Sequence, residues 1–313
     1  MNNATKHASY TAANALPVKL FLSDGAKELR PVHISWYPTN ECNLNCKFCS
    51  CSNRDRKLTM DIFTAINVIH DFADLGCKAV SISGGGEPLC HPHLADMIAE
   101  FHGCGIKIGL VTNGMLLGRL DRKTLDMLAW CRISSSISFD DSYEKALDRV
   151  VEADVDWAFS HVVGRQPDIE RIVKLVDYAE RHEFSHVRLV GDLREPHAID
   201  WSGIKHTLAG KDDVVIYQER KTFVASDRCL LGYVKPLIAP DWKMYQCCGV
   251  QYAMRKMSLD NPPELCMGDA RDLDAIYGGP RHPFPVKCVR CYYEDHNIAL
   301  QALTSDIAHE EFA

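Results

Sequence analysis

The stretch Cys42-Asn43-Leu44-Asn45-Cys46-Lys47-Phe48-Cys49 guides the interpretation of the whole chain. Three residues separate its first two cysteines and two separate the next pair, so a short loop can aim three thiolates at one centre. A closed structural zinc site needs four ligands. Three thiolates leave one iron of a four-iron cluster without a protein ligand, and that iron can bind a small molecule. The loop therefore predicts an iron–sulfur centre with an open position.

Composition describes an ordinary globular protein. The chain has 313 residues, 46% of them hydrophobic and 25% charged, which is enough for one large domain and a smaller one. Lys and Arg number 35 against 42 Asp and Glu, so the net charge of −7 gives no general attraction to nucleic acid.

Export and membrane insertion are not predicted. Residues 1–20 hold no continuous apolar segment of the kind a secretion signal needs, and no apolar run reaches membrane-spanning length. Fourteen cysteines in such a chain favour metal or redox chemistry over disulfides. Because an iron–sulfur cluster needs a reducing compartment, we expect a cytoplasmic protein.

From residue 31 onward, short apolar strands alternate with helical patterns, which predicts βαβ units and a parallel sheet. Six units are too few to close an eight-stranded barrel. Helices are expected at 59–75 with Thr59 as N-cap, and at 93–101, 122–130, 141–151 and 167–182. Strands are expected at 32–37, 79–83, 106–111, 133–139, 157–163 and 186–190.

Each candidate motif follows a predicted strand. The cysteine loop follows the first, Gly84-Gly85-Gly86-Glu87-Pro88 the second and Asn113 the third. In barrels built from βα units, chemistry gathers at this end of the strands. The glycine run could also be a plain strand-to-helix turn. A phosphate-binding loop is disfavoured because no Gly-Lys-Ser/Thr follows.

The three-cysteine loop and the Gly-Gly-Glu-Pro element resemble the radical S-adenosylmethionine (radical SAM) enzymes. That resemblance implies a partial (β/α)6 barrel over residues 31–212. It also implies a 4Fe-4S cluster on Cys42, Cys46 and Cys49, whose open iron chelates SAM. An electron from the cluster then cleaves SAM to a 5′-deoxyadenosyl radical. The family pattern places Phe48 near the adenine, and Gly85, Gly86 and Glu87 toward the SAM ammonium.

Further SAM contacts are implied at other strand ends. Ser138 and Asp140 match positions near the SAM ribose and carboxylate, with Ser136 next. Asp140 could instead cap the following helix, and Asn113 could belong to a simple Asn-Gly turn. Arg188 alternates with apolar residues and could point into the barrel, toward a SAM or substrate carboxylate or a structural acidic partner.

The pattern changes from about residue 200. Residues 214–217 and 221–224 read as two strands, and a second group of cysteines follows. Residues 238–247 resemble the hairpin that carries a ligand in SPASM and twitch extensions, although Trp242 stands where that family usually has glycine. The resemblance implies a small α+β domain over 213–313, closest in cysteine layout to aminocyclitol dehydrogenases. Its auxiliary 4Fe-4S cluster would be held by Cys229, Cys247, Cys288 and Cys291.

Alternatives remain at this second site. Cys266 could replace one ligand, Cys248 adjoins Cys247 but should point the other way on a strand, and a four-cysteine zinc site is the rival interpretation. Cys51 could donate a hydrogen atom to a substrate radical, but we prefer an ordinary loop cysteine. The remaining cysteines, Cys77, Cys90, Cys104 and Cys131, are interpreted as small apolar residues.

The chain is therefore predicted to be a radical SAM oxidoreductase. We expect it to oxidise a small polar molecule, with an electron donor of the flavodoxin or ferredoxin type. Peptide crosslinking or epimerisation is the alternative within enzymes, although residues 1–30 look too short for a leader-binding domain. A non-catalytic iron–sulfur or zinc protein is the alternative outside them. Residues 296–313 are expected to form a closing helix on the barrel.

Overall fold

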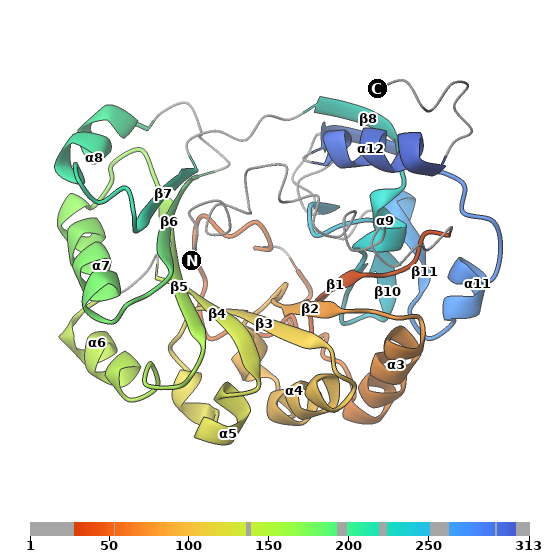
Figure 1. Ribbon diagram of the computed structural model, residues 1–313, viewed down its shortest axis with the longest axis horizontal. Helices are drawn as coiled ribbons and strands as arrows, with labels where there is room; N and C mark the ends of the chain where they lie inside the picture. Colours follow the sequence, from red (N-terminus) through yellow and green to blue (C-terminus); the bar gives the residue numbers. More distant parts are fainter. Residues whose placement is uncertain are drawn as a thin grey trace.

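The computed structural model describes residues 28–52, 54–135, 139–192, 199–218, 224–250, 263–291 and 293–304. Its centre is one curved sheet with helices on its outer side (Figure 1). The strand order is β11-β10-β9-β1-β2-β3-β4-β5-β6-β7, and β1 to β7 run parallel to their neighbours. The predicted α/β class with a parallel sheet is confirmed.

The parallel strands are β1 His33–Trp36, β2 Ala79–Ile82, β3 Lys107–Thr112, β4 Leu128–Ser134, β5 Asp156–Val163, β6 His186–Gly191 and β7 Val215–Gln218. The helices between them are α3 Ile62–Asp74, α4 Leu94–Gly103, α5 Arg122–Leu125, α6 Asp141–Asp148, α7 Ile169–Arg181 and α8 Trp201–Thr207, with short turns η2 Pro88–Cys90 and η3 Leu117–Arg119.

The C-terminal part adds strands β9 Leu237–Ile238, β10 Lys243–Tyr245 and β11 Cys266–Asp269 to the sheet beside β1. Strands β8 Val224–Cys229 and β12 Phe284–Cys291 form a separate antiparallel pair. The helical segments described in this part are α9 Leu231–Val234, η4 Pro263–Leu265, α11 Leu273–Tyr277 and α12 Glu294–Thr304.

The two faces of the sheet differ in chemistry. On the outer face, Phe159 of β5 packs between Tyr178 of α7 and Phe184, with its ring 4.6 Å from that of Phe184. Burying an aromatic side chain of this kind contributes about 2–3 kcal/mol. Ser160 pairs in register with Arg188 and alternates with Phe159, so both face the inside of the curved sheet. The apolar core therefore lies under the helices, and the inside is polar.

Several predicted elements need correction. Helix α3 begins after Asp61, whose side chain accepts a hydrogen bond from the Thr64 N–H, whereas Thr59 bonds to Thr39 across a short bridge. The helix predicted at 122–130 ends at Leu125, because β4 begins at Leu128 and pairs with β3 from its first residue.

Two C-terminal predictions also change. Strand β7, expected beyond the barrel domain, pairs in parallel with β6 and extends the main sheet. Helix α12 packs against β8 and α9 rather than on the barrel helices. Both outcomes depend on contacts between distant parts of the chain, which local patterns do not encode.

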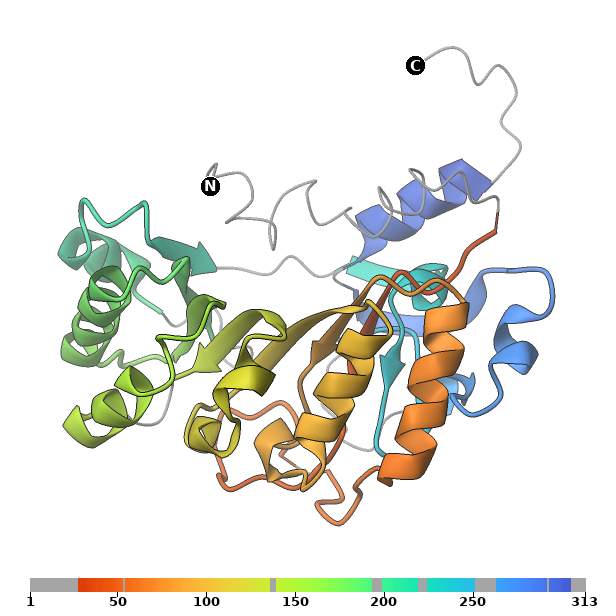
Figure 2. The same cartoon turned by 60° about the horizontal axis from the view of Figure 1, so that its bottom comes forward.

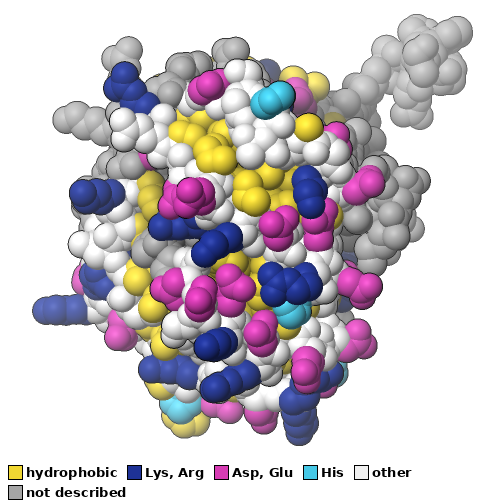
Figure 3. All heavy atoms as spheres, turned by 90° about the vertical axis from the view of Figure 1, so that its left-hand side faces the viewer, with side chains coloured by type: hydrophobic (Ala, Val, Ile, Leu, Met, Phe, Trp, Pro, Cys, Tyr) yellow, Lys and Arg dark blue, Asp and Glu magenta, His cyan; other side chains and the backbone are white. Residues whose placement is uncertain are grey.

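The face formed by the α6, α7 and α8 side of the molecule carries intermingled acidic and basic side chains (Figure 3). No single-sign patch dominates it among the residues that are described there. Within the described part of the chain, no helix combines the length and the apolar character needed to cross a bilayer.

Candidate active site and cysteine clusters

The loop between β1 and α3 carries Cys42, Cys46 and Cys49, all half-buried. The Cys49 N–H donates to the Cys46 carbonyl at 3.1 Å, and the Leu44 N–H lies 3.4 Å from the Cys42 sulfur. Burial, together with the neighbouring Cys49 and Cys42, raises the pKa of the Cys46 thiol to about 11. The three sulfurs thus share one site, and this fits a cluster that takes them as thiolates.

Arg54 and Cys51 flank the third cysteine. A hydrogen bond from Cys51 is the largest effect on Cys49 and lowers its pKa to about 6, with help from the Arg54 guanidinium. The Arg54 Nη1 lies 3.7 Å from the Cys49 sulfur, while its Nε donates to the Asn40 carbonyl at 2.7 Å. Cys51 itself is buried, and its hydrogen bond to Cys49, followed by burial, raises its pKa. Sequence reasoning missed Arg54, which no motif marks.

The glycine run packs directly on the start of the cysteine loop. A Cβ on Gly86 would lie 1.9 Å from the Glu41 carbonyl oxygen, and one on Gly85 would lie 2.0 Å from Asn40 Oδ1. The Gly86 and Glu87 N–H groups donate to the Thr39 and Glu41 carbonyls at 3.0 and 2.8 Å. Only glycine allows this approach, so the run holds the cysteine loop in place.

The Glu87 carboxylate lies 3% exposed and accepts three hydrogen bonds. Its Oε1 accepts from the Leu89 N–H at 3.1 Å and the Thr112 hydroxyl at 2.6 Å, and its Oε2 accepts from the Asn113 N–H at 2.7 Å. Burial raises the pKa of Glu87, while these donors lower it. Glu87 therefore ties the end of β2 to the end of β3; a direct contact with SAM stays a prediction.

Asn113 connects Glu87 and its hydrogen-bond donors to the cysteine loop. Its Nδ2 donates to Asn43 Oδ1 at 2.8 Å, and its Oδ1 accepts from the Met115 N–H at 3.0 Å. The Asn-Gly turn foreseen from the sequence is present, with Gly114 at a φ of 81°. The Tyr143 hydroxyl donates to the Asn113 carbonyl at 2.6 Å. Asn113 thus lies at the strand end, in contact with the cysteine loop.

The other predicted SAM contacts are placed unevenly. Asp140 is exposed and caps α6, accepting from the Ser142 and Tyr143 N–H groups at 3.0 Å, which is the capping role considered above. Phe48 is half-buried in the cysteine loop. Ser136 and Ser138 lie outside the described residues.

Among the described residues, Arg132 and Arg188 lie on strand positions that face the inside of the sheet. Arg188 Nη2 lies 3.4 Å from Ser160 Oγ, in line with its predicted inward direction. Arg132 of β4 pairs in register with Ala158, next to Ser160 in the alternation, and its guanidinium lies 5.6 Å from the Trp130 ring. Sequence reasoning missed both residues, because it placed Trp130 at the end of a helix and Arg132 in the connection before the strand expected at 133–139.

The four C-terminal cysteines expected to act together line one cavity. Cys229, Cys247, Cys288 and Cys291 come from the ends of β8 and β10 and from β12, and Tyr293 and Asn297 complete the wall. Asn297 Oδ1 accepts from the Leu230 and Leu231 N–H groups at 3.0 Å, which fixes the start of α9 beside the cavity.

The thiols of this cavity are shielded from water, and backbone N–H groups lie close to two of them. Burial raises the pKa of Cys229 to about 12 and that of Cys288 to about 11, so protons must leave when a metal binds. Backbone N–H groups of Gly249 and Tyr293 lie 3.3 and 3.4 Å from the Cys247 and Cys291 sulfurs, a contact that suits thiolate ligands.

The neighbouring Cys266 and Cys248 are not among the residues that line this cavity. Cys266 contacts the Gly268 carbonyl at 3.5 Å, and Cys248 contacts the Tyr293 hydroxyl at 3.5 Å. Among the described residues, no three cavity sulfurs lie within 4.8 Å of one another. The choice between a zinc ion and an iron–sulfur cluster at these cysteines stays a prediction.

Known proteins share parts of this chain. A nucleotide dehydratase dependent on S-adenosylmethionine, from a Thermoplasmatales archaeon, is 28% identical over 159 residues, or 50% of each chain. PqqA peptide cyclase from Gluconobacter oxydans is 31% identical over 114 residues, 36% of this chain and 31% of that protein. The chain matches 18% to 38% of the lengths of three further curated relatives.

The fold also matches solved structures. SuiB from Streptococcus suis, bound to precursor peptide SuiA, superposes with a TM-score of 0.56 at 15% identity, covering 84% of this chain and 69% of that one. The sequence model of the radical SAM superfamily matches residues 36–198, more than half of the 313 residues. This match covers the cysteine loop, the glycine run and the parallel strands β2 to β6. The chain belongs to the radical SAM superfamily.

Proposed function

We propose that this chain cleaves S-adenosylmethionine reductively, removes a hydrogen atom from an organic substrate and completes a net oxidation. The observation that carries the proposal is the presence of two separate cysteine sites in one chain, three thiols on an open loop and four around a cavity. Members of the superfamily use a 4Fe-4S cluster and SAM. When bound, these groups supply the radical, and a second 4Fe-4S cluster supplies an electron acceptor.

The chain's own residues hold and orient these groups. Cys42, Cys46 and Cys49 would bind the first cluster, with Arg54 and Cys51 donating toward the Cys49 sulfur. Gly85, Gly86 and Glu87 hold the cysteine loop against β3, and Asn113 stands beside it. Phe48, Asp140, Ser136 and Ser138 are proposed to lie around SAM. Cys229, Cys247, Cys288 and Cys291 would bind the second cluster.

The polar interior of the sheet favours a small polar substrate. Arg132, Arg188 and Ser160 present donors to the space inside the sheet. Guanidinium groups bind carboxylate and phosphate oxygens in paired geometry. A small molecule with an anionic group would therefore be oriented against the strand ends where the radical forms.

Peptide modification is the second candidate. Its support is the fold shared with a SuiB structure that holds a precursor peptide, and the partial sequence similarity to a peptide cyclase. A four-cysteine second cluster without an open iron favours electron acceptance in either case. We propose a flavodoxin or ferredoxin as the electron donor.

The test is anaerobic reconstitution with iron and sulfide, followed by dithionite and SAM. About eight irons per chain with 5′-deoxyadenosine formed supports two four-iron clusters. Cys46→Ala should abolish 5′-deoxyadenosine, whereas Cys288→Ala should keep SAM binding and stop net turnover. SAM cleavage that survives Cys46→Ala would overturn the assignment. Tight zinc binding without cleavage would identify a non-catalytic metal protein instead.

A further inference from the structure

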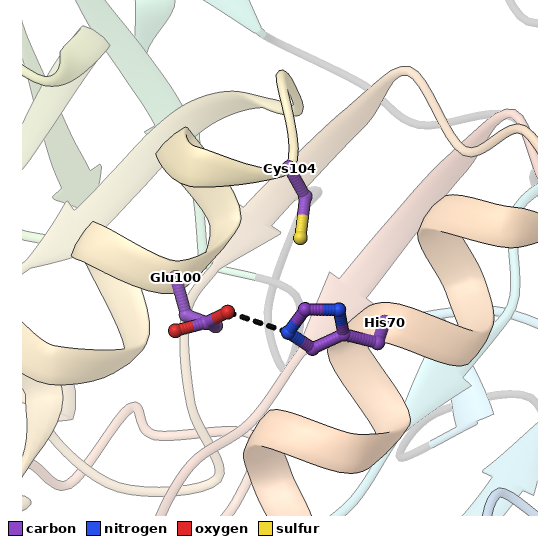
Figure 4. Close-up of side chains that lie close together, drawn as sticks. All are labelled: His70, Glu100 and Cys104. Carbon is purple, nitrogen blue, oxygen red and sulfur yellow. Dashed lines mark hydrogen bonds and ion pairs between the residues drawn. The ribbon is translucent and has the colours of Figure 1, made fainter.

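Three ligand-type side chains meet on the outside of the barrel, between α3 and α4 (Figure 4). His70 comes from α3, Glu100 from α4, and Cys104 is the C-cap residue of α4. The His70 Nε2 lies 2.6 Å from the Glu100 Oε1, and the nitrogen, oxygen and sulfur ligand atoms all lie within 4.8 Å of one another. None of these residues belongs to either cysteine site described above.

Helix geometry explains this meeting. Glu100 and Cys104 are four residues apart, so they share one face of the end of α4, and the Cys104 N–H donates to the Glu100 carbonyl. On α3, His70 and Asp74 share a face in the same way. Burial raises the pKa of the Cys104 thiol, and the negative charges of Glu100 and Asp74 act in the same direction. Two helices thus present one pair of ligand-type residues each.

We propose that His70, Glu100 and Cys104 bind one divalent transition-metal ion, zinc above all, with water in the fourth position. Imidazole, carboxylate and thiolate are the three ligand types that zinc takes in proteins, and zinc prefers four ligands. Magnesium and calcium prefer oxygen ligands alone, so a site with nitrogen and sulfur selects against them.

The plain alternative is a surface ion pair between His70 and Glu100. Such a pair is exposed, with the His70 side chain 55% accessible, and contributes little to stability. It gives no role to Cys104, whose half-buried sulfur points into the same space (Figure 4). A metal ion would use all three side chains and would connect α3 to α4.

The site lies away from the proposed chemistry. Cys104 comes just before β3, at the strand end opposite to Asn113 and the cysteine loop. A metal here would therefore stabilise the packing of α3 on α4 without touching SAM. Metal bound to the folded form alone raises stability by mass action.

The experiment uses the full-length, reconstituted protein under anaerobic conditions. Zinc binding is measured by isothermal titration calorimetry, with zinc and iron counted by mass spectrometry after desalting. The variants are His70→Ala and Cys104→Ser, and the matched control is His102→Ala, which removes an exposed histidine of α4 outside the group. Iron content in every protein reports whether zinc has displaced a cluster.

We expect wild type and His102→Ala to bind one zinc ion with the same affinity. His70→Ala and Cys104→Ser should bind it at least about tenfold more weakly, a change in binding free energy of about 1.4 kcal/mol. Iron content should be equal in all four. Zinc should also raise the urea midpoint of wild type and of the control, but not that of His70→Ala. Identical zinc isotherms in wild type and His70→Ala would overturn the proposal, as would a loss confined to Cys104→Ser.

Discussion

The substitution Glu87→Gln tests whether the buried carboxylate acts on the fold or on SAM. Gln has the same size, so no cavity forms. Its single carbonyl oxygen can keep the Leu89 and Thr112 donors, but its amide nitrogen would then face the Asn113 N–H across 2.7 Å. One donor is left facing another donor, in a part of the structure that is already shielded from water.

The magnitude follows from this bond count. A hydrogen bond to a charged acceptor contributes about 1.5–3 kcal/mol. Burial raises the pKa of Glu87, which means that the buried charge is itself unfavourable. Removing this charge therefore offsets part of the lost hydrogen-bond energy. We expect a net decrease of about 1–2 kcal/mol in the free energy of unfolding. With a urea slope of about 3 kcal/mol per molar, the midpoint falls by roughly 0.3–0.7 M.

The assay is urea unfolding of the reconstituted protein without SAM, followed by SAM binding at equilibrium. Glu152→Gln is the control, because Glu152 is exposed on the turn after α6. If Glu87 holds the ends of β2 and β3 together, Glu87→Gln should have a lower urea midpoint than wild type in the absence of SAM. An unchanged midpoint together with weaker SAM binding would refute the reasoning and would place the carboxylate on SAM instead.

Three further substitutions or reactions probe the same region. Arg54→Gln removes a positive charge 3.7 Å from the Cys49 sulfur, so the reduced cluster loses stabilisation and the midpoint of an EPR redox titration should fall, whereas Lys57→Gln should leave it unchanged. In cluster-free protein, the pKa of Cys49 is lowered to about 6 and that of Cys46 is raised to about 11, so iodoacetamide at pH 7 should label Cys49 first. Labelling of Cys49 should drop below pH 6, and equal labelling of the two cysteines would contradict the geometry. Gly114→Ala places a Cβ on a residue with left-handed backbone, 2.2 Å from the Tyr143 hydroxyl, and should lower the free energy of unfolding in urea by about 1–2 kcal/mol or more. The control Gly118→Ala meets no atom within 4 Å and should lower it far less.

The order of the elements could be predicted well from the sequence, whereas the assignment of the cysteines as metal ligands stays a prediction. Cysteine spacing is a local property, and alternating apolar strands such as 157–163 must be buried wherever they pair. The N-terminal end of α3 shows where this reasoning stops. Thr59 and Asp61 are both good caps, and only the bridge between Thr39 and Thr59 removes Thr59 from the choice. Contacts between distant segments decided that point.

The same limit explains the missed interior residues. Residues 122–130 have helix-compatible spacing, yet register with β3 makes Leu128 to Ser134 a strand and turns Arg132 inward. Arg54 was missed for a related reason. It lies five residues after Cys49 in the sequence, and only the folded loop brings its guanidinium close to the Cys49 sulfur. Spacing can find ligands, but it does not find the groups that adjust their charge.

The register of the sheet also relates the two proposed clusters. The Cys42–Cys49 loop leaves β1 at its C-terminal end, whereas β9 runs parallel to β1 and β10 returns antiparallel toward the other end. Tyr245 pairs with Leu237, which pairs with Ser35, so Cys247 follows at the N-terminal end of β1.

The four residues of β1 therefore separate the two sites by about 13 Å along the strand. In Figure 2 the loop after β1 and the β8–α12 part lie at opposite ends of the sheet. A substrate held on the polar inner face of that sheet would lie between the proposed radical source and the proposed electron acceptor. Hydrogen abstraction at one end and electron removal at the other then need no movement of the substrate, which is the physical reason to prefer net oxidation for this chain.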